Sequence, residues 1–407
     1  MTGGLKMAYN MTDGTKNIVL QKIAKEKGTP IFVIDLEKVR NNYLRFKKNL
    51  PDVQVYYAVK SNSDPKIVKT LFDMGASFDV ASLPEFHLVR ENIKNMLPKD
   101  QQEFIWEKII YAHPIKIIKT LHELEPYKPL VTFDNLDELE KIKKHCPSAG
   151  IVLRLEVSNE GSVVDLSSKF GASREDAVNL AVKAFEMGLN IEGLSFHVGS
   201  QCTNFNNYMK ALDLASYVFD EVKKRGYKIA NPKTGKRILD IGGGFPAEEY
   251  DSSIMSFEEL AKKLREEINR LFPNDIEIVA EPGRFLVANA CTVVVNIIGR
   301  AFRHGITSYY IDDGVYGTFS GQLFDHQIYT LESFKNGEKE KCIIFGPTCD
   351  GFDTVSPSTN DKKYPYGNLP KMELGEFLFV NNMGAYTLAS ASNFNGFPIA
   401  KVVYVNK

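Results

Sequence analysis

The chain has 407 residues, of which 43% are hydrophobic and 25% are charged, and its net charge is −1 at pH 7. This length allows two domains, although an α/β barrel alone can use about 250 residues. The balanced charge gives no reason to expect nucleic acid or an anionic membrane as a partner. No apolar run reaches the length of a membrane span, and the first residues show no apolar core of a signal peptide.

The five cysteines are odd in number, scattered, and without any CxxC spacing. A disulfide framework or a structural zinc site would need paired or clustered cysteines. We therefore expect free thiols in a reducing compartment, a cytoplasmic protein and no bound metal.

After a first strand-like segment, IFVID (31–35), the chain alternates short apolar segments with amphipathic helical patterns. Eight apolar segments follow this alternation: VYYAVK (55–60), FDVAS (78–82), IIYAHP (109–114), LVTFDN (130–135), IVLRLEV (151–157), IEGLSFHVG (191–199), RILDIGGG (237–244) and IEIVAEPG (276–283). Alternating strands and helices indicate parallel strands, and eight of them predict a closed (β/α)8 TIM-type barrel. An open doubly wound sheet is the alternative.

The pattern changes after about residue 284, where strands follow one another without helices and are separated by Gly, Pro and Asp turns. This part indicates an antiparallel β-domain, which IFVID joins from the amino-terminal side. We predict an α/β protein with a barrel over residues 35–285 and a β-domain made of residues 1–34 and 286–407.

Polar residues or glycines stand at the ends of most predicted barrel strands: Lys60, Asp79, Ser82, His113, Asp134, Arg154, His197, Gly242 to Gly244 and Glu281. In a βα barrel these ends form the active-site rim. A lone strand-end lysine is more often a surface residue. The functional alternative for Lys60 is a Schiff-base lysine, whose amine attacks an aldehyde when its pKa is lowered.

The string DIGGGFP (240–246) fits neither GxGxxG nor a P-loop, so it indicates neither a dinucleotide site nor a nucleotide triphosphate site. At the end of the seventh barrel strand it occupies the position where barrels bind phosphate, and EPGRFLV (281–287) adds Gly283 and Arg284. Glu281 could keep a pyridine nitrogen protonated. His197 is either a core histidine or a stacking partner for a flat ring. A lysine, a phosphate loop and an acid together predict pyridoxal 5′-phosphate as cofactor.

Longer strings carry a resemblance to a known family: YAVKSN, FDVAS, SFHVGS, DIGGGFP, EPGR, DDGVYGTFSGQLFDH, GPTCDGFD, NMGAYT and SNFNGF. Over residues 30–400 the chain resembles the eukaryotic-type ornithine decarboxylases, which are pyridoxal-phosphate enzymes of the alanine-racemase-like fold group. The resemblance implies decarboxylation of L-ornithine to putrescine and CO2, the first step of polyamine synthesis.

The resemblance also implies roles for individual residues. Cofactor contacts are implied for Lys60, Asp79, Arg154, His197, Ser200, Gly243, Gly244, Glu281, Gly283, Arg284 and Tyr386. Catalytic roles are implied for Lys60, Asp79, His197, Glu281 and Cys349, the last as proton donor. A lone cysteine is more often an inert core residue, but the turn Pro-Thr-Cys-Asp-Gly around Cys349 is not typical of a core.

Substrate contacts are implied for Phe324, Asp325, Asp350 and Phe394. Each acid alone would be read as a surface turn residue; here each could hold a terminal ammonium. Phe324 departs from the family, which commonly has tyrosine there, so the substrate preference and inhibitor response are open at this position.

The resemblance further implies a homodimer with shared active sites, an ion pair between Lys169 of one chain and Asp353 of the other, and antizyme as a possible partner. Alternatives remain: a lysine or arginine decarboxylase, a catalytically inactive protein like the antizyme inhibitors, or an amino-acid racemase on the same fold. The last would need a second base in place of the cysteine.

Overall fold

The structure is a computed structural model that describes residues 9–12, 14–162, 168–248, 254–356 and 366–407. The chain divides into two compact units, which are described separately. The barrel unit comprises residues 42–286, and the β-unit comprises residues 1–41 and 287–407. Among the described residues, no helix combines the length and apolar character needed to cross a bilayer.

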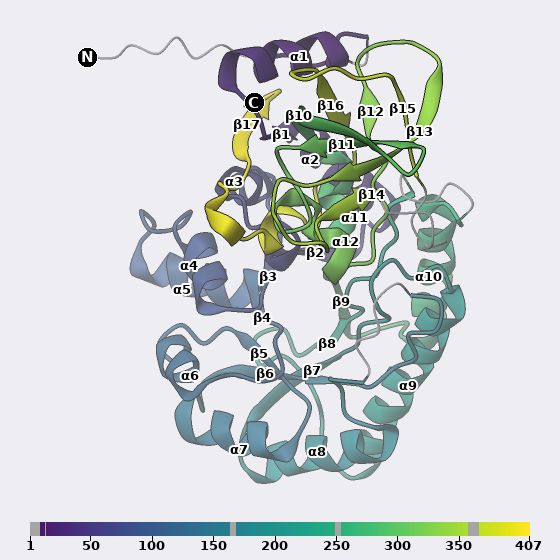
Figure 1. The fold of residues 1–407 in the computed structure, drawn as a ribbon. Coiled ribbons are helices and arrows are strands. Elements are labelled where there is room, and N and C mark those ends of the chain that lie inside the picture. Colours follow the sequence, from purple (N-terminus) through teal and green to yellow (C-terminus); the bar gives the residue numbers. More distant parts are fainter. Residues whose placement is uncertain (1–8, 13, 163–167, 249–253, 357–365) are drawn as a thin grey trace. The chain divides into compact units, whose positions relative to one another are not determined.

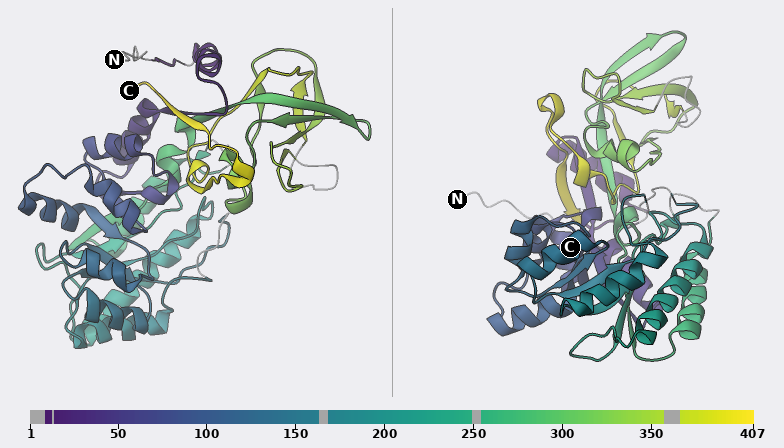
Figure 2. Two further views of the ribbon diagram at one scale, coloured as in Figure 1. Left: turned by 60° about the vertical axis from the view of Figure 1, so that its left-hand side comes forward. Right: turned by 90° about the horizontal axis from the view of Figure 1, so that it is seen from below.

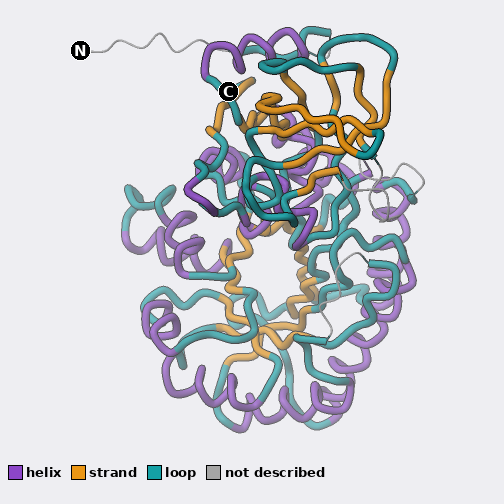
Figure 3. Tube along the Cα trace, viewed as in Figure 1, coloured by secondary structure: helices purple, strands orange, loops and turns teal. Residues whose placement is uncertain are grey.

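The barrel unit contains a closed ring of parallel strands, visible in Figure 3 as an orange ring enclosed by purple helices. The strands are β2 (Val53–Ala58), β3 (Ser77–Val80), β4 (Ile109–Tyr111), β5 (Leu130–Phe133), β6 (Gly150–Arg154), β7 (Asn190–Ser195), β8 (Arg237–Asp240) and β9 (Ile276–Ala280). The ring closes where β9 pairs with β2 in parallel. This confirms the predicted (β/α)8 barrel and excludes the open sheet.

Helices cover the outside of the barrel, as Figures 1 and 2 show for the blue and teal part of the chain. The described helices of this unit are α3 (Pro65–Asp73), α4 (Leu83–Arg90), α5 (Pro98–Lys108), α6 (Ile118–Leu124), α7 (Leu136–His145), α8 (Arg174–Glu186), α9 (Phe205–Lys224) and α10 (Phe257–Leu271). Two helices cross the unit boundaries: α2 (Leu36–Asn49) and α11 (Arg284–Val287).

Helix α10 illustrates how the sequence produces this layer. Ser256 caps its amino end by accepting a hydrogen bond from the Glu259 amide. Its buried residues recur at three- and four-residue spacing and include Phe257, Leu260 and Leu264. The apolar face therefore packs inward, while the charged residues other than the buried Glu267 lie toward the outside.

The interior of the barrel has an apolar layer with polar groups above it. The apolar layer consists of Tyr56, Ile110, Leu130, Val152, Ile238 and Val279. Because side chains alternate along a strand, residues two positions further along point the same way. These positions carry Arg154, Asp240 and Glu281. The sequence thus places ionisable groups above an apolar floor, at the carboxyl ends of the strands.

The β-unit contains helix α1 (Lys16–Lys27) and a nine-stranded sheet. Its strands are β1 (Ile31–Asp35), β10 (Cys291–Arg303), β11 (Ile306–Ile311), β12 (Glu332–Ser333), β13 (Lys339–Phe345), β14 (Thr354–Ser356), β15 (Gly367–Pro370), β16 (Phe377–Val380) and β17 (Lys401–Val405). A short helix, α12 (Gly321–Phe324), lies between β11 and β12. Most neighbouring strands are antiparallel, as predicted. Two pairings, β1 with β17 and β11 with β13, are parallel.

The predicted strand bounds need one correction that matters for the site. The sequence pattern extended the first barrel strand to Lys60, but β2 ends at Ala58 and Lys60 lies in a 3-10 turn, Val59–Ser61. The same holds for His197 and Glu281, which follow β7 and β9. The apolar run misplaces the ends because the turns beyond the strands are themselves buried.

Candidate active site

Lys60 forms an ion pair with Asp79 at the rim of the barrel. The distance from Lys60 Nζ to Asp79 Oδ2 is 2.5 Å, and the side chains are 37% and 0% exposed, respectively. The other oxygen, Asp79 Oδ1, is buried and has no hydrogen-bond partner among the described residues. A fully buried carboxylate needs a paired charge, so the ion pair holds the amine of the partly exposed Lys60 side chain beside Asp79.

Glu281 and Asp240 form a pair of buried acids beside this ion pair. Glu281 is 7% exposed and Asp240 is 1% exposed. Burial raises the pKa of Asp240 to about 7. Burial, and next the nearby Asp240 carboxylate, raise the pKa of Glu281 well above its ordinary value. Both shifts disfavour two negative charges at this place.

The most informative feature of Glu281 is its carboxyl oxygen Oε1. Glu281 Oε1 is buried and has no hydrogen-bond partner among the described residues. A buried carboxyl oxygen is rarely left in this state in a native protein. It therefore marks a position where a donor from a bound group would fit.

Arg154 adds a positive charge close to these acids. Burial lowers the pKa of Arg154, and the carboxyl groups of Glu281, Asp134 and Asp240 oppose that shift. Its guanidinium also lies 5.1 Å from the centroid of the Phe170 ring. Arg154 thus offsets part of the negative charge at the rim.

The glycine loop after β8 forms a cradle with no room for side chains. A Cβ atom on Gly243 would lie 2.8 Å from the Glu281 carbonyl oxygen and 2.9 Å from His197 Nε2. Gly244 has a φ of 94°, and a Cβ there would lie 2.5 Å from the Gly199 carbonyl oxygen. Because these glycines have no side chains, other groups can approach the backbone of the loop closely.

Packing and hydrogen bonds fix this loop from below. The Tyr208 hydroxyl donates to the Gly243 carbonyl at 3.1 Å. Phe245, the next residue after the glycines, is buried against Phe46, whose ring centroid is 5.0 Å away. Phe245, the phenylalanine of DIGGGFP, therefore anchors the loop by its packing.

Arg284 and Ser200 supply donors at the same place. Arg284 Nη2 donates to Ser200 Oγ at 2.9 Å, and Arg284 is only 4% exposed. A Cβ atom on Gly283 would lie 2.9 Å from Ser61 Cβ, so the backbone approaches closely there too. A guanidinium, a hydroxyl and bare backbone amides are the donor set that a phosphate requires.

His197 is neutral in this environment. Burial, followed by the charges of Arg154 and Lys60, lowers the pKa of His197 well below its ordinary value. The Gly199 amide donates to His197 Nδ1 at 3.1 Å, which leaves Nε2 as the protonated nitrogen. A neutral imidazole above the glycine loop can stack on a flat ring.

The remaining predicted residues belong to the β-unit, where Cys349 lies on an exposed turn. Cys349 Sγ lies 3.5 Å from Asn395 Oδ1, and the Tyr316 hydroxyl donates to Asp350 Oδ2 at 2.7 Å. The ring of Tyr316 stacks on Phe394 with centroids 4.3 Å apart. The structure thus brings three predicted residues, Cys349, Asp350 and Phe394, into one cluster.

Other predicted residues of the β-unit differ in exposure. Phe324 is 68% exposed, whereas the neighbouring Asp325 is 4% exposed. Tyr386 is partly buried and has a left-handed φ of 55°. The contacts of these three residues with a cofactor or substrate remain predictions.

Asp353 has a clear role within its own unit. It is 1% exposed, and its two carboxylate oxygens accept hydrogen bonds from the amides of Val315 and Thr348, both at 2.9 Å. These bonds close the turn that carries Cys349. Lys169 is exposed, with its ammonium 5.0 Å from the Phe170 ring centroid. The Lys169–Asp353 pair between chains remains a prediction.

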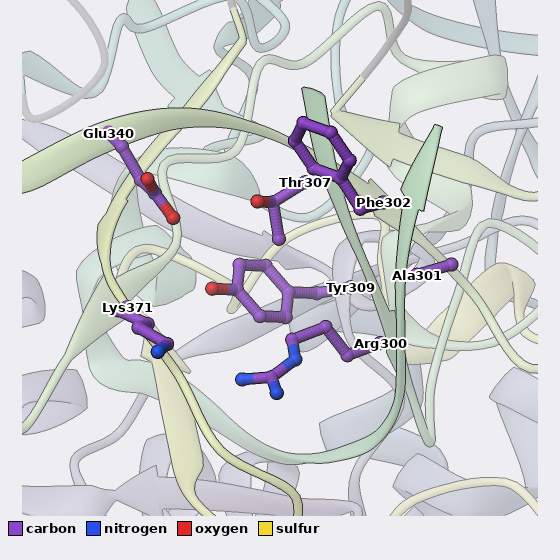
Figure 4. Close-up of a pocket in the computed structure, with 7 residues that line it drawn as sticks. All are labelled: Arg300, Ala301, Phe302, Thr307, Tyr309, Glu340 and Lys371. Carbon is purple, nitrogen blue, oxygen red and sulfur yellow. The ribbon is translucent and has the colours of Figure 1, made fainter. Parts of the chain in front are cut away.

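A hollow elsewhere in the β-unit contains none of the predicted residues. It has a volume of about 160 Å3 and is lined by Arg300, Ala301, Phe302, Thr307, Tyr309, Glu340 and Lys371, as Figure 4 shows. Arg300 already donates to Glu373 at 3.0 Å. We do not assign a function to it.

The barrel rim fits pyridoxal phosphate on several independent observations. Lys60 offers an amine on a partly exposed side chain, Glu281 Oε1 has no donor among the described residues, and the glycine loop with Arg284 offers phosphate donors. These are the three groups that pyridoxal phosphate needs at its aldehyde, ring nitrogen and phosphate. Among the described residues, no group of three or more His, Cys, Asp or Glu side chains is placed to hold a metal.

Comparison with known proteins defines the class. Residues 36–288 match the family model "Pyridoxal-dependent decarboxylase, pyridoxal binding domain". The chain therefore belongs to the pyridoxal-dependent decarboxylase family, and its cofactor is pyridoxal phosphate.

The similar proteins differ in their named functions, so the comparison does not identify one substrate. The chain is 35% identical to a lysine/ornithine decarboxylase of Selenomonas ruminantium, over 94% of this chain and 91% of that protein. It is 36% identical to antizyme inhibitor 2 of Xenopus laevis (96% and 84%) and 35% identical to ornithine decarboxylase of Mus musculus (96% and 84%). The structure of lysine/ornithine decarboxylase from Vibrio vulnificus with cadaverine has a TM-score of 0.85 at 34% identity, covering 98% of this chain and 100% of that one.

Sequence reasoning missed three residues that the structure places in these clusters. Asp240 stands in the quoted string DIGGGFP, and its position two residues after the inward-facing Ile238 is a signal that could have identified it. Tyr316 and Asn395 also stand in quoted strings. Nothing in their spacing indicates that they lie beside Asp350 and Cys349.

Proposed function

We propose that the protein decarboxylates L-ornithine to putrescine and CO2 with pyridoxal phosphate. The observation that carries the proposal is the amine of the partly exposed Lys60, held 2.5 Å from the buried Asp79, next to a buried acid, Glu281, whose Oε1 has no hydrogen-bond partner among the described residues. A protein that only binds a partner has no use for this set. The bound cofactor would supply an electron sink for the electrons that decarboxylation leaves on the α-carbon.

The barrel unit would bind and polarise the cofactor. Lys60 would hold the cofactor at its aldehyde carbon, because an unprotonated lysine amine can form a Schiff base there. Glu281 Oε1 would accept a hydrogen bond from the protonated ring nitrogen, which favours the charged ring. Neutral His197 would cover one face of the ring and exclude water from it.

The β-unit would supply a proton and the substrate's charge partner. Cys349 would donate its thiol proton to the α-carbon after CO2 leaves, with Asn395 Oδ1 orienting the thiol. Asp350 suits the terminal ammonium of the substrate: hydrogen bonds from the Phe352 amide and then from the Tyr316 hydroxyl lower its pKa, so it is ionised at neutral pH. Lysine or arginine remains the alternative substrate, because similar proteins include lysine/ornithine decarboxylases and an arginine decarboxylase.

Release of CO2 and formation of the diamine from ornithine, lysine and arginine, assayed in parallel, tests the proposal. We expect ornithine to give the highest kcat/KM. A higher value for lysine or arginine would reassign the substrate, and no CO2 from any of the three would contradict the proposal.

A second candidate is a non-catalytic binding protein, because one similar relative is an antizyme inhibitor. The two candidates differ in the cofactor. A decarboxylase shows the visible absorbance of a bound pyridoxal group, whereas a pure binding protein with no cofactor shows none. We expect the visible band.

We further propose a homodimer in which Cys349 of one chain completes the site containing Lys60 of the other. Mixing inactive Lys60→Ala chains with inactive Cys349→Ala chains tests this arrangement. In a two-fold dimer, random association gives half mixed dimers with one intact site each, so activity should return to about a quarter of wild type. Heterodimers that form without any return of activity would show that both residues act within one chain.

A further inference from the structure

Tyr57 is a fully buried residue of strand β2 with no role in the chemistry outlined above. Its neighbour Tyr56 belongs to the apolar layer inside the barrel. Because side chains alternate along a strand, Tyr57 points away from that interior and toward the covering helices. Tyr57 therefore lies on the opposite side of the strand from the proposed cofactor site.

The hydroxyl of Tyr57 reaches past the turn that carries Lys60. It donates a hydrogen bond to the Asn62 carbonyl oxygen at 2.7 Å. The Asn62 amide in turn donates to the Val59 carbonyl at 3.0 Å, which closes the 3-10 turn. Lys60 thus lies between two residues, Tyr57 and Asn62, that a buried side-chain hydrogen bond holds together.

Other contacts fix the same turn. Ser61 Oγ donates to the Ala58 carbonyl at 2.8 Å. A Cβ atom on Gly283 would lie 2.9 Å from Ser61 Cβ and 3.1 Å from Ala58 Cβ, so the turn packs directly against the backbone of the loop after β9. The Tyr57 hydroxyl is the contact that can be removed while the packing is kept, because phenylalanine fills nearly the same space.

The position of the Lys60 amine depends on this turn. A lysine side chain has four flexible carbons, and much rotamer entropy is lost when it is held in one position. The ion pair with Asp79 fixes one end of the side chain, and the turn fixes the other. An amine that attacks an aldehyde must approach its carbon to about 3 to 3.5 Å in the right direction, so a small shift of the turn should slow the attack.

We propose that Tyr57 is a positioning residue that directs the Lys60 amine at the cofactor aldehyde through its hydrogen bond to Asn62. In the step that this serves, the amine nitrogen forms a double bond to the aldehyde carbon. The aldehyde oxygen leaves as water with the two amine protons. Tyr57 takes part in neither bond change and acts only by holding the turn. This inference rests on the role proposed for Lys60.

Two related compounds separate the position of Lys60 from the rest of the site. Pyridoxal phosphate can form the visible band, whereas pyridoxine phosphate has an alcohol in place of the aldehyde and cannot react with an amine. Stopped-flow absorbance at saturating pyridoxal phosphate measures the rate of band formation, with Lys60→Ala as background, and calorimetry measures the affinity for pyridoxine phosphate. In Tyr57→Phe we expect the rate to fall about 10- to 100-fold and the affinity to stay within about threefold of wild type.

Two other buried tyrosines provide matched comparisons. Tyr208→Phe removes the hydroxyl that donates to the Gly243 carbonyl in the glycine loop, so it should weaken the binding of both compounds. Tyr309→Phe removes a buried hydroxyl of the β-unit that accepts a hydrogen bond from the Met372 amide, and it should change neither measurement. Melting curves of all three variants measure the loss of stability that a buried hydroxyl causes by itself.

A conservative replacement should restore the rate. At position 57, 4-aminophenylalanine still donates toward the Asn62 carbonyl and should form the band within about threefold of the wild-type rate. If Tyr57→Phe does not fold, 4-fluorophenylalanine, which is closer to tyrosine in size and cannot donate, takes its place.

An unchanged rate in Tyr57→Phe, a parallel loss of pyridoxine phosphate affinity, an equal slowing in Tyr309→Phe, or no recovery with 4-aminophenylalanine would overturn the proposal. A wild-type protein that forms no visible band would end the role proposed for Lys60 and this inference with it. A band that forms equally fast in wild type and Tyr57→Phe would end this inference alone.

Discussion

The two ends of the barrel both bury an acid, yet only one of them has the properties of an active site. At the amino end Glu192 in β7 is fully buried, and at the carboxyl end Asp240 in β8 is 1% exposed. Burial raises the pKa of each to about 7. A raised pKa alone therefore does not distinguish the two ends.

Hydrogen bonding does distinguish them. Both oxygens of Glu192 accept hydrogen bonds, from Asn190 Nδ2 at 2.6 Å and from Asn231 Nδ2 at 2.8 Å. At the carboxyl end, Glu281 Oε1 and Asp79 Oδ1 lack partners among the described residues. Within the barrel, unmet carboxylate oxygens, unlike burial or a raised pKa, therefore distinguish the end at which we propose that the cofactor binds.

Replacement of Lys60 should give the largest effect, because it removes the proposed reactive amine from the carboxyl end of the barrel. In Lys60→Ala and Lys60→Arg the visible band of the bound cofactor should disappear. Ornithine turnover should fall by more than about a thousandfold, which is a small part of the rate acceleration that enzymes typically achieve. Arginine keeps a cation opposite Asp79 but offers no amine for a Schiff base. Absorbance and CO2 release are the measurements.

The two Lys60 variants separate chemistry from stability. Lys60→Ala leaves the buried Asp79 carboxylate without its cation and should lower the melting temperature, whereas Lys60→Arg should retain most of it. A visible band or normal turnover in either variant would contradict the assignment of Lys60.

The glycine loop should give the next largest effect. In Gly243→Ala the new Cβ would lie 2.8 Å from the Glu281 carbonyl and 2.9 Å from His197 Nε2, so the cradle must shift. We expect cofactor affinity to fall by roughly 10- to 100-fold, the range for loss of supporting structure at a binding site.

Gly14→Ala is the matched control, because none of the described residues lies within 4 Å of a Cβ there. Equilibrium titration with pyridoxal phosphate compares the two variants. Equal affinity in both would show that the glycine loop does not hold the cofactor.

Glu192→Gln should have the smallest effect. It changes the buried acid at the amino end of the barrel, where no ligand is proposed to bind. The pKa of Glu192 rises from 4.5 to about 7 on folding, so between these values the folded state holds a proton that the unfolded state has lost. Wild-type stability should therefore fall as pH rises from about 4.5 to 7, by at most about 3 kcal/mol. Glutamine cannot ionise and removes this contribution.

Denaturant unfolding at pH 5 and pH 8 measures the difference. We expect the free energy of unfolding of Glu192→Gln, taken relative to that of wild type, to be higher at pH 8 than at pH 5. Cofactor affinity and turnover should be unchanged. If the difference in the free energy of unfolding between wild type and variant is the same at both pH values, Glu192 is ionised at both.

The sequence predicted the barrel because its apolar segments and amphipathic helices alternate regularly. It also predicted Lys60, Glu281 and the glycine loop, because residue type and strand position together restrict their chemistry. It placed the end of β2 too late, since Val59 continues the apolar run into a buried turn. Asp240 was missed because its importance lies in its effect on the pKa of Glu281, which is 41 residues away and comes close only through the pairing of β8 with β9.

Borohydride reduction of the cofactor-loaded protein, followed by peptide mass spectrometry, tests the central claim most directly. Reduction fixes the cofactor covalently to the amine that holds it. We predict the added mass of a pyridoxyl phosphate group on the peptide that contains Lys60, with none on the buried Lys116. Modification of a different lysine, or no modification in a protein that has the visible band, would contradict the account.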